Sequence, residues 1–455
     1  MSLARVRRSA LLLPLALGIA LSAPAHAGGY AAPADFKSRL VSQTSGQVAS
    51  YYAYGPGPLW IDADGTLDPA ADELVTLIQT AADDGLDPAA LHADQLAAAV
   101  MAAKQQPTPE ALAAAEAMLS RTFADYVAAL RQESGANMKY EASTLQPRFN
   151  GAYFALNNAA KAPSLADYIR DMEWMHPLYG PLRWSLVNDP TVTPDARRVA
   201  IENLDRIRQI PAQPQGRHII INAATAMLTM YDGDRLADSM RVVVGKPDPH
   251  KETPAYAGYI RTAFVNPYWN VPDDFVKSLI AKNVLEQGQA YLKRQGYEVL
   301  SGWGDDAQRL DPTKLDWRAV QRGEIFVHVR QKPGPRNSMG TIKYEFPNPY
   351  GIYLHDTPEK DLMDKDNRQL SAGCIRLEDA KKLGMWLLQT NDIDMSSDAP
   401  EQKLDLPQPV PVYVVYLTAS ANNGRLAIGD DPYARDRAAP AASTATSSSL
   451  ALQNE

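Results

Sequence analysis

Two short motifs in the C-terminal half decide how this sequence is interpreted: YLHDT at residues 353–357 and SAGCIRL at residues 371–377. The second carries Cys374, the single cysteine of the chain. A thiol is a good nucleophile only as the thiolate, so at its ordinary pKa of roughly 8.5 it needs a base or a positive neighbour. Histidine suits that task because its ordinary pKa lies near neutrality. The motifs therefore indicate Cys374 as a nucleophile and His355 as its base, if the loop between them returns to one sheet end.

The neighbours of these two residues fit acyl transfer. Gly373 allows the backbone to approach a substrate carbonyl, and the amides of Gly373 and Cys374 could form an oxyanion hole. Asp356 adjoins His355 along a strand, so its side chain should point to the opposite face. The competing interpretation is a buried structural cysteine beside a structural histidine, and the motifs alone leave it open.

Both motifs resemble those of L,D-transpeptidases with a YkuD-type catalytic domain, in which a histidine precedes Ser/Thr-His-Gly-Cys by 14 to 17 residues. His355 and Ser371 have this spacing here. Ala372 stands where many members carry a second histidine. In this the chain is similar to the large periplasmic, YcbB-like branch, whose motifs read Tyr-x-His-Asp-Thr and Ser-x-Gly-Cys-Ile-Arg.

The resemblance implies a periplasmic enzyme that forms 3-3 cross-links in peptidoglycan by cysteine thioester transfer from tetrapeptide stems. It implies catalytic roles for Cys374, His355, Gly373 and Asp356, the last orienting His355 through its backbone carbonyl. For substrate binding we expect Tyr353 on the same strand face as His355, Arg376 as a carboxylate-binding fork, Trp269 as a cleft wall and Ser371 in the supporting loop. The implied partners are peptidoglycan stem peptides and carbapenem-type inhibitors.

Other functions stay open at this point. The same chemistry could transfer the acyl group to water, as in an L,D-carboxypeptidase, or to an amine of an envelope protein. A protein of another class would be a non-catalytic scaffold that binds the cell wall. The histidines show no metal-ligand spacing, so no metal and no cofactor is expected. The acidic net charge of −8 and the lack of a basic run argue against nucleic acid as a partner.

The pattern of apolar residues predicts an α+β protein with a mostly helical N-terminal scaffold domain and a mainly β, YkuD-like catalytic domain. Helical spacing runs through residues 51–197, which we take as the scaffold and a short bridge, whereas strand-like runs with turn signals fill residues 198–420. Residues 275–322 interrupt the strands and are expected to form a capping subdomain. The peptidoglycan-binding module common in this branch is apparently absent.

The two ends of the chain are expected to lie outside these domains. Residues 1–27 combine three arginines, an apolar run and Ala25-His26-Ala27, which is typical of a secretory signal peptide cleaved after Ala27 and predicts a periplasmic protein. Residues 28–50 are expected to be a loosely ordered lead-in. Residues 421–455 end in a run of Ala, Ser and Thr and are expected to be a disordered tail.

Overall fold

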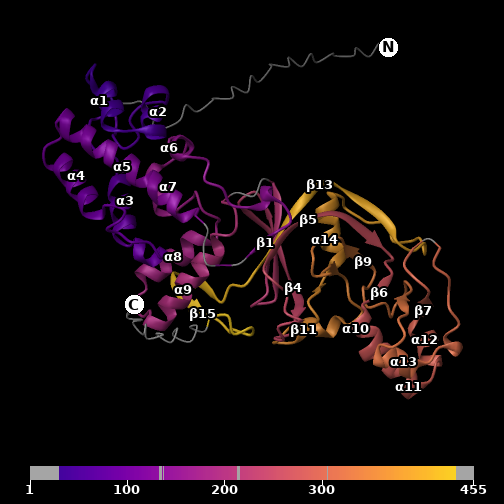
Figure 1. Cartoon of the computed structure of the whole chain (residues 1–455). Helices are drawn as coiled ribbons and strands as arrows, with labels where there is room; N and C mark the ends of the chain where they lie inside the picture. The colour runs from indigo at the N-terminus through magenta and orange to yellow at the C-terminus, as the bar shows by residue number, and fades with distance from the viewer. Residues whose placement is uncertain (1–29, 133–135, 137, 213–215, 305, 437–455) are drawn as a thin grey trace, which may run out of the picture.

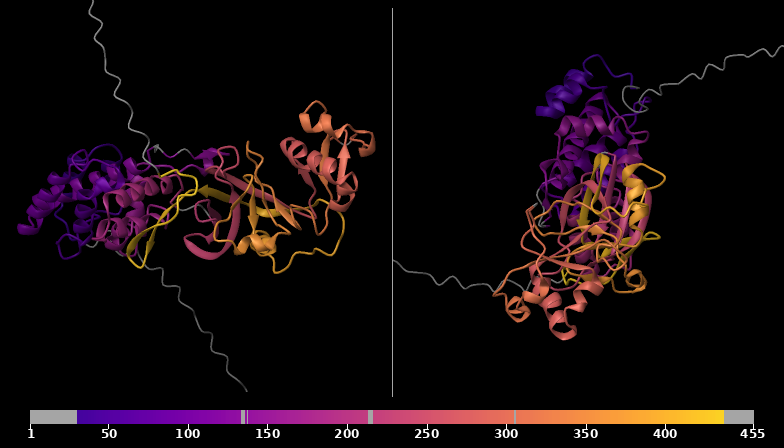
Figure 2. Two further views of the ribbon diagram at one scale, coloured as in Figure 1. Left: turned by 90° about the horizontal axis from the view of Figure 1, so that it is seen from below. Right: turned by 90° about the vertical axis from the view of Figure 1, so that its right-hand side faces the viewer.

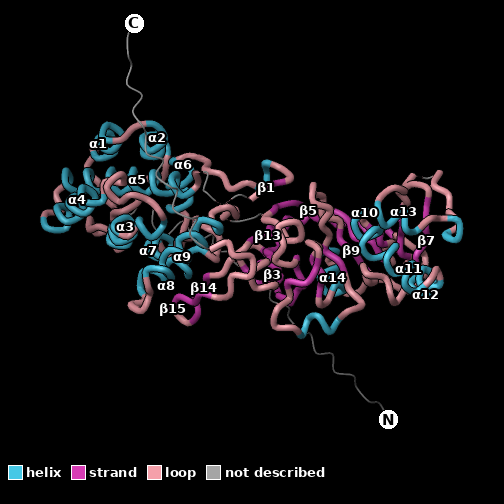
Figure 3. The backbone as a smooth tube through the Cα atoms, turned by 60° about the horizontal axis from the view of Figure 1, so that its bottom comes forward, coloured by secondary structure: helices cyan, strands magenta, loops and turns pink. Residues whose placement is uncertain are grey.

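The computed structural model describes residues 30–132, 136, 138–212, 216–304 and 306–436, and the signal peptide predicted for residues 1–27 lies outside them. The described chain forms an elongated molecule with a helical domain at one end, a central sheet and a small subdomain at the other end (Figures 1 and 2). Helices dominate the first half and strands the second (Figure 3), which confirms the predicted α+β class. Within the described ranges, no helix combines the length and apolarity that a membrane crossing needs.

The N-terminal domain is built from short helices whose starts are encoded locally. Thr108 and Thr193 each accept a hydrogen bond from the backbone amide three residues later and are followed by proline at the first helical position. The helices are α1 (Phe36–Gln43), α2 (Gly46–Tyr54), α3 (Ala70–Gln79), α4 (Ala93–Gln105), α5 (Pro109–Leu130), α6 (Ala152–Ala159), α7 (Leu165–Arg170), α8 (Tyr179–Asn188) and α9 (Pro194–Ile207), with 3-10 turns η1 (Ala81–Asp84) and η2 (Ser143–Leu145).

The segment expected to be a loose lead-in is part of this helical domain. Residues 36–43 form α1, and Phe36 and Leu40 lie fully inside the core. The expectation was wrong because the two apolar residues, spaced four apart, give one turn of buried helical face that packs against α2 and α5.

A large sheet forms the catalytic half. Its strand order is β1-β5-β13-β2-β3-β4-β12-β10-β9, with β11 on β4 and a further pairing of β5 with β9. The strands are β1 (Lys139–Tyr140), β2 (Arg217–Asn222), β3 (Met227–Asp232), β4 (Arg235–Gly245), β5 (Tyr256–Val265), β9 (Ile342–Tyr344), β10 (Leu354–His355), β11 (Gln369–Ser371), β12 (Ile375–Leu377) and β13 (Gln402–Val415).

Alternation along the central strands gives the sheet two apolar faces. Ile220, Tyr413 and Val415 join the core of the helical domain. Ile219, Ile221 and their neighbours form a second core on the opposite face, which is covered by α14 (Ala380–Leu388) and bordered by the 3-10 turn η5 (Lys360–Asp364). The helical domain is therefore packed onto the sheet as part of one continuous core.

The subdomain at the far end has a core of its own, built around Val271, Ile280 and Val329. Its three-stranded sheet has the order β6-β8-β7, so the subdomain extends over residues 269–331, beyond the expected 275–322. Its elements are β6 (Trp269–Val271), α10 (Asp273–Phe275), the π-helical turn η3 (Val276–Ala281), α11 (Lys282–Gln287), α12 (Ala290–Gln295), β7 (Tyr297–Leu300), η4 (Pro312–Lys314), α13 (Trp317–Arg322) and β8 (His328–Gln331).

The expected disordered tail from residue 421 is wrong for residues 421–436. They belong to a hairpin of β14 (Ala419–Asn422) and β15 (Arg425–Ile428), which packs on α8 and α9, and to a following segment that returns to the sheet. Tyr433 is buried there and stacks on Tyr416, and Asp436 pairs with Arg206. Composition alone did not reveal these anchors. Residues 437–455 lie outside the described chain.

Candidate active site

Strand pairing brings the two predicted motifs together. β10 and β12 are parallel neighbours, with Leu354 opposite Ile375 and His355 opposite Arg376. Continuing this register puts Tyr353 opposite Cys374, so Cys374 lies diagonally across the strand pair from His355. Side chains in such diagonal positions share one face of a sheet. Leu354 and Ile375 turn to the other face, where both are fully buried.

His355 is buried and held in one orientation by the backbone. Its Nδ1 lies 2.6 Å from the carbonyl oxygen of Asp356, the atom from which the sequence analysis expected this contact. A carbonyl only accepts hydrogen bonds, so Nδ1 carries the proton and Nε2 keeps its lone pair. Burial, together with the positive charge of Arg376, lowers the pKa of His355 to about 4. The imidazole is therefore neutral at pH 7 and has the protonation state of a general base.

The Cys374 thiol is partly exposed and lies 3.9 Å from the carbonyl oxygen of Gly351. Burial raises its pKa, while the backbone of Tyr353 and the charge of Arg376 act in the opposite direction. The thiol thus remains protonated at neutral pH. With both groups uncharged, the arrangement suits proton transfer that accompanies attack, and it differs from a resting thiolate–imidazolium pair.

The Asp356 carboxylate faces away from the imidazole. One oxygen accepts hydrogen bonds from the amide and hydroxyl of Thr341, at 2.9 and 2.8 Å, and the other accepts one from Lys360 at 2.7 Å. Burial works to raise the pKa of Asp356, but these hydrogen bonds outweigh it and hold the pKa below its ordinary value. Asp356 therefore acts on His355 through its backbone carbonyl, and its carboxylate anchors the strand end.

Ser371 and Gly373 form the turn that carries Cys374. The Ser371 hydroxyl donates to the carbonyl of Cys374 at 2.6 Å and accepts the Gly373 amide at 3.1 Å. Gly373 has φ of +114°, a conformation that favours glycine. Ser371 is buried and its hydroxyl supports the loop, as the sequence predicted, and the Gly373 amide is already bonded in this structure. No hydrogen bond engages the Cys374 amide within the described part of the chain.

A second layer of residues that sequence reasoning missed fixes this turn from outside. The Thr253 hydroxyl donates to the carbonyl of Gly373 at 2.8 Å and accepts the Gly245 amide at 2.9 Å. Tyr433, from the segment expected to be disordered, donates to the carbonyl of Gly245 at 2.7 Å. These residues lie far from Cys374 in sequence and carry no motif, so no signal in the sequence could have found them.

The other residues predicted to bind substrate are Tyr353, Arg376 and Trp269, and they lie in three different surroundings. Tyr353 is 36% exposed. Burial raises its pKa, and the charge of the nearby Cys374 thiolate raises it further. Arg376 forms an ion pair with Glu359 at the edge of the site. Trp269 packs in the subdomain against Phe275 and Tyr297, at centroid distances of 6.2 and 6.3 Å. These ring contacts lie within the subdomain, and a role of Trp269 as a cleft wall stays a prediction.

A metal centre has no support in the side-chain arrangement, because the described residues include no group of three or more His, Cys, Asp or Glu side chains positioned to hold an ion. The acid–base pair and the turn amide are instead the parts that acyl transfer to a cysteine uses.

Comparison with known proteins agrees with acyl-transfer chemistry at this site. Residues 216–411 match the family described as the L,D-transpeptidase catalytic domain (YkuD), and residues 46–186 match the family described as the scaffold domain. A Haemophilus influenzae protein named "Putative L,D-transpeptidase" is 29% identical over 295 residues, which are 62% of this chain and 57% of that protein. The chain thus matches just over half the length of this curated relative.

Two solved structures match parts of this chain, both with low sequence identity and low TM-scores. An L,D-transpeptidase from Mycobacterium smegmatis has 10% identity and a TM-score of 0.22 over 44% of this chain and 58% of its own. The Ldtfm–avibactam carbamoyl enzyme has 14% identity and a TM-score of 0.21 over 45% and 51%. These scores are too low to define a common fold, and the family matches carry the assignment. On that basis residues 216–411 are an L,D-transpeptidase (YkuD) catalytic domain, and residues 46–186 are a scaffold domain.

Proposed function

We propose that this protein is a periplasmic L,D-transpeptidase that forms 3-3 cross-links in peptidoglycan through a thioester on Cys374. The observation that carries the proposal is the pairing of β10 with β12, which sets an oriented, neutral His355 diagonally across from the one thiol of the chain. Two further supports are the family of residues 216–411 and the signal-peptide pattern of residues 1–27.

Acylation would begin with a tetrapeptide stem as donor. Nε2 of His355 takes the thiol proton as Cys374 Sγ attacks the carbonyl carbon of the third stem residue. The oxyanion that forms would be stabilised by the Cys374 amide, and by the Gly373 amide if substrate releases it from Ser371. Collapse of this intermediate breaks the bond to the terminal D-alanine, whose nitrogen receives the proton from His355, and leaves a thioester.

The second half-reaction would regenerate the thiol. The side-chain amine of a second stem attacks the thioester carbonyl while His355 accepts its proton. The carbon–sulfur bond then breaks, the proton returns to Cys374, and the new amide is the 3-3 cross-link. Water in place of the amine would give a tripeptide, so the acceptor alone separates a transpeptidase from a carboxypeptidase.

The test is intact-mass analysis of the mature protein incubated with a carbapenem and, separately, with a disaccharide-tetrapeptide. We expect one carbapenem adduct per chain and cross-linked dimers that have lost one D-alanine. Cys374→Ala is a clean control because it removes the single thiol of the chain, and circular dichroism would show that its fold is kept.

The products decide between the alternatives. Tripeptide without dimers would replace the proposal with a carboxypeptidase. Loss of D-alanine that persists in Cys374→Ala would contradict the thioester. Absence of both adduct and turnover, with a folded protein, would overturn an enzymatic function and favour a scaffold that binds the wall.

A further inference from the structure

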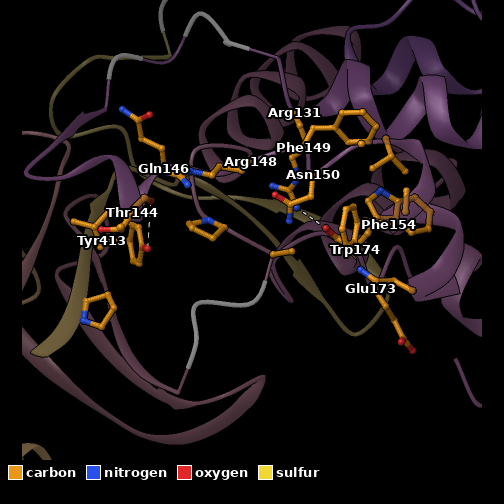
Figure 4. Close-up of a pocket in the computed structure, with 18 of the residues that line it drawn as sticks. Arg131, Thr144, Gln146, Arg148, Phe149, Asn150, Phe154, Glu173, Trp174 and Tyr413 are labelled. Atoms are coloured by element: carbon orange, nitrogen blue, oxygen red, sulfur yellow. Dashed lines mark hydrogen bonds between the residues drawn. The ribbon is translucent and has the colours of Figure 1, made fainter. Parts of the chain in front are cut away.

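A large cleft lies between the helical domain and the sheet, lined by residues of α5, the segment 144–163 and the edges of β5 and β13 (Figure 4). Its volume is about 1100 Å³, which is more than a single small molecule needs. No residue of the Cys374 turn lines it. The mechanism above leaves this cleft without a role.

The cleft concentrates positive charge in an acidic protein. Arg131, Arg148 and Lys161 line it, and within the described chain none of the three has a carboxylate partner. Arg131 is instead held by the carbonyls of Trp174 and Ile210, and burial lowers its pKa to about 10. Among the lining residues that the structure describes, Glu173 is the one exposed acid. A ligand with negative groups would meet cations that are not yet neutralised.

The rest of the lining suits a saccharide. Phe149 and Phe154 are 38% and 54% exposed and offer flat apolar faces within the cleft. The exposed amide side chains of Gln146, Asn150 and Asn158 lie beside them, able both to donate and to accept hydrogen bonds. Sugar rings combine apolar faces with hydroxyl edges. This mixture of flat rings and amides therefore suits a saccharide better than it suits a purely apolar or a purely charged ligand.

A second, smaller cavity is lined by residues of β1, by Tyr256 and by the segment 347–350. Glu141 lines the smaller cavity and forms an ion pair at 2.6 Å with Arg261, which lines the cleft. The same cavity is bordered by residues 347–350, which lead directly to Gly351 beside the thiol. A long ligand could therefore occupy the cleft and still present a side branch to Cys374.

We infer that this cleft binds a glycan strand with carboxylate-bearing peptide stems, that is, polymeric peptidoglycan, and so holds the polymer whose stems react at Cys374. The inference rests on the proposed function for the identity of the polymer, but it concerns a different surface.

The experiment is sedimentation of the mature full-length protein with purified sacculi, in the background of Cys374→Ala so that turnover plays no part. The test variant is Arg148→Glu with Lys161→Glu, two exposed side chains without carboxylate partners. We expect its apparent affinity for sacculi to fall about tenfold or more, because two attractive contacts become repulsive. Lys37→Glu with Lys293→Glu is the matched control, since both are exposed cations that do not line the cleft, and it should bind as the parent does.

Turnover of a soluble disaccharide-tetrapeptide, measured with Cys374 intact, separates this inference from the proposed function. The cleft variant should keep its rate on this short substrate and lose activity on sacculi. Equal sacculus binding by the cleft and control variants would overturn the inference while leaving the function untouched. Competition by polyglutamate but not by chitin oligosaccharides would overturn the saccharide part, whereas competition by both would support it.

Discussion

Two buried polar networks in this molecule can be compared, one in the helical domain and one at the catalytic turn. In the helical domain, Asp84 accepts hydrogen bonds from Tyr126, Tyr179 and Arg183, and all four side chains are buried. At the catalytic turn, Ser371, Thr253 and Gly373 bond to one another around a thiol that stays partly exposed.

The difference lies in what each network holds. The Asp84 network closes on itself and joins η1, α5 and α8, so its loss should be felt as lost stability. The Ser371 network is assembled from distant segments and fixes the position of one nucleophile, so its loss should be felt mainly as lost rate. Single substitutions in each network test this distinction.

The largest effect is expected from Arg183→Met. This change leaves the Asp84 carboxylate buried without its ion-pair partner, which costs about 3–5 kcal/mol of the free energy of unfolding. Urea denaturation measures it, and Arg170→Met, which removes exposed ion pairs, should cost less than about 1 kcal/mol. Adduct formation by the folded Arg183→Met protein should match the parent. A stable variant with a slow thiol would refute the distinction.

At the catalytic turn, Thr253→Val should lower the acylation rate by roughly 10–100-fold, because Gly373 loses the hydroxyl that fixes its carbonyl. The Gly373 carbonyl and the Gly245 amide each lose a hydrogen-bond partner, which should cost about 1–3 kcal/mol of stability per group. Thr253→Ser restores the hydroxyl and should recover the rate. The measurement is the rate of carbapenem adduct formation, followed by mass spectrometry of samples quenched at set times. An unchanged rate in Thr253→Val would contradict a positioning role for Thr253.

A third prediction concerns the contact between the two domains. His176 and His218 lie there with their Nε2 atoms 3.4 Å apart, and burial lowers their pKa values to about 3 and about 4. Their neutral forms favour the folded state, so stability is full above about pH 6.5 and falls as the pH drops toward 4.

His218→Phe keeps the stacking on Tyr231 and removes one titrating group. It should reduce the loss of stability between pH 6.5 and 4 by on the order of 1–3 kcal/mol. Thermal unfolding across this range measures it, with His92→Phe, an exposed site, as the control. If stability falls equally with pH in His218→Phe and in the parent, this histidine pair does not control the loss of stability at low pH.

The smallest effect is expected from Arg376→Gln. The charge of Arg376 lowers the pKa of both His355 and Cys374, so its removal should move the acid limb of thiol alkylation from near pH 4 to higher pH. The rate at pH 7 should change by less than about threefold, because both groups are already neutral there. Iodoacetamide labelling of the single thiol across pH measures this. Glu359→Gln, which removes the partner of Arg376, should leave the limb in place.

Much of the catalytic centre could be predicted because its chemistry is local. His355, Asp356, Gly373 and Cys374 lie in two short motifs, and strand alternation was enough to turn the Asp356 carboxylate away from the imidazole. The motif around Trp269 gave its place in the chain but not the core that its side chain joins, which is that of the subdomain. The occupied Gly373 amide was missed for a similar reason, since a hydrogen bond within a turn depends on its folded shape.

The domain order, the α+β class and the proposed pair of Cys374 and His355 could be predicted from the sequence, because periodicity and short motifs depend on neighbours within a few residues. The folded structure was needed to show that residues 421–436 fold back onto the sheet, that Thr253 and Tyr433 hold the turn, and that a cationic cleft opens between the domains. Each of these joins segments more than a hundred residues apart. Such contacts arise from packing of the whole chain, and no local pattern encodes them.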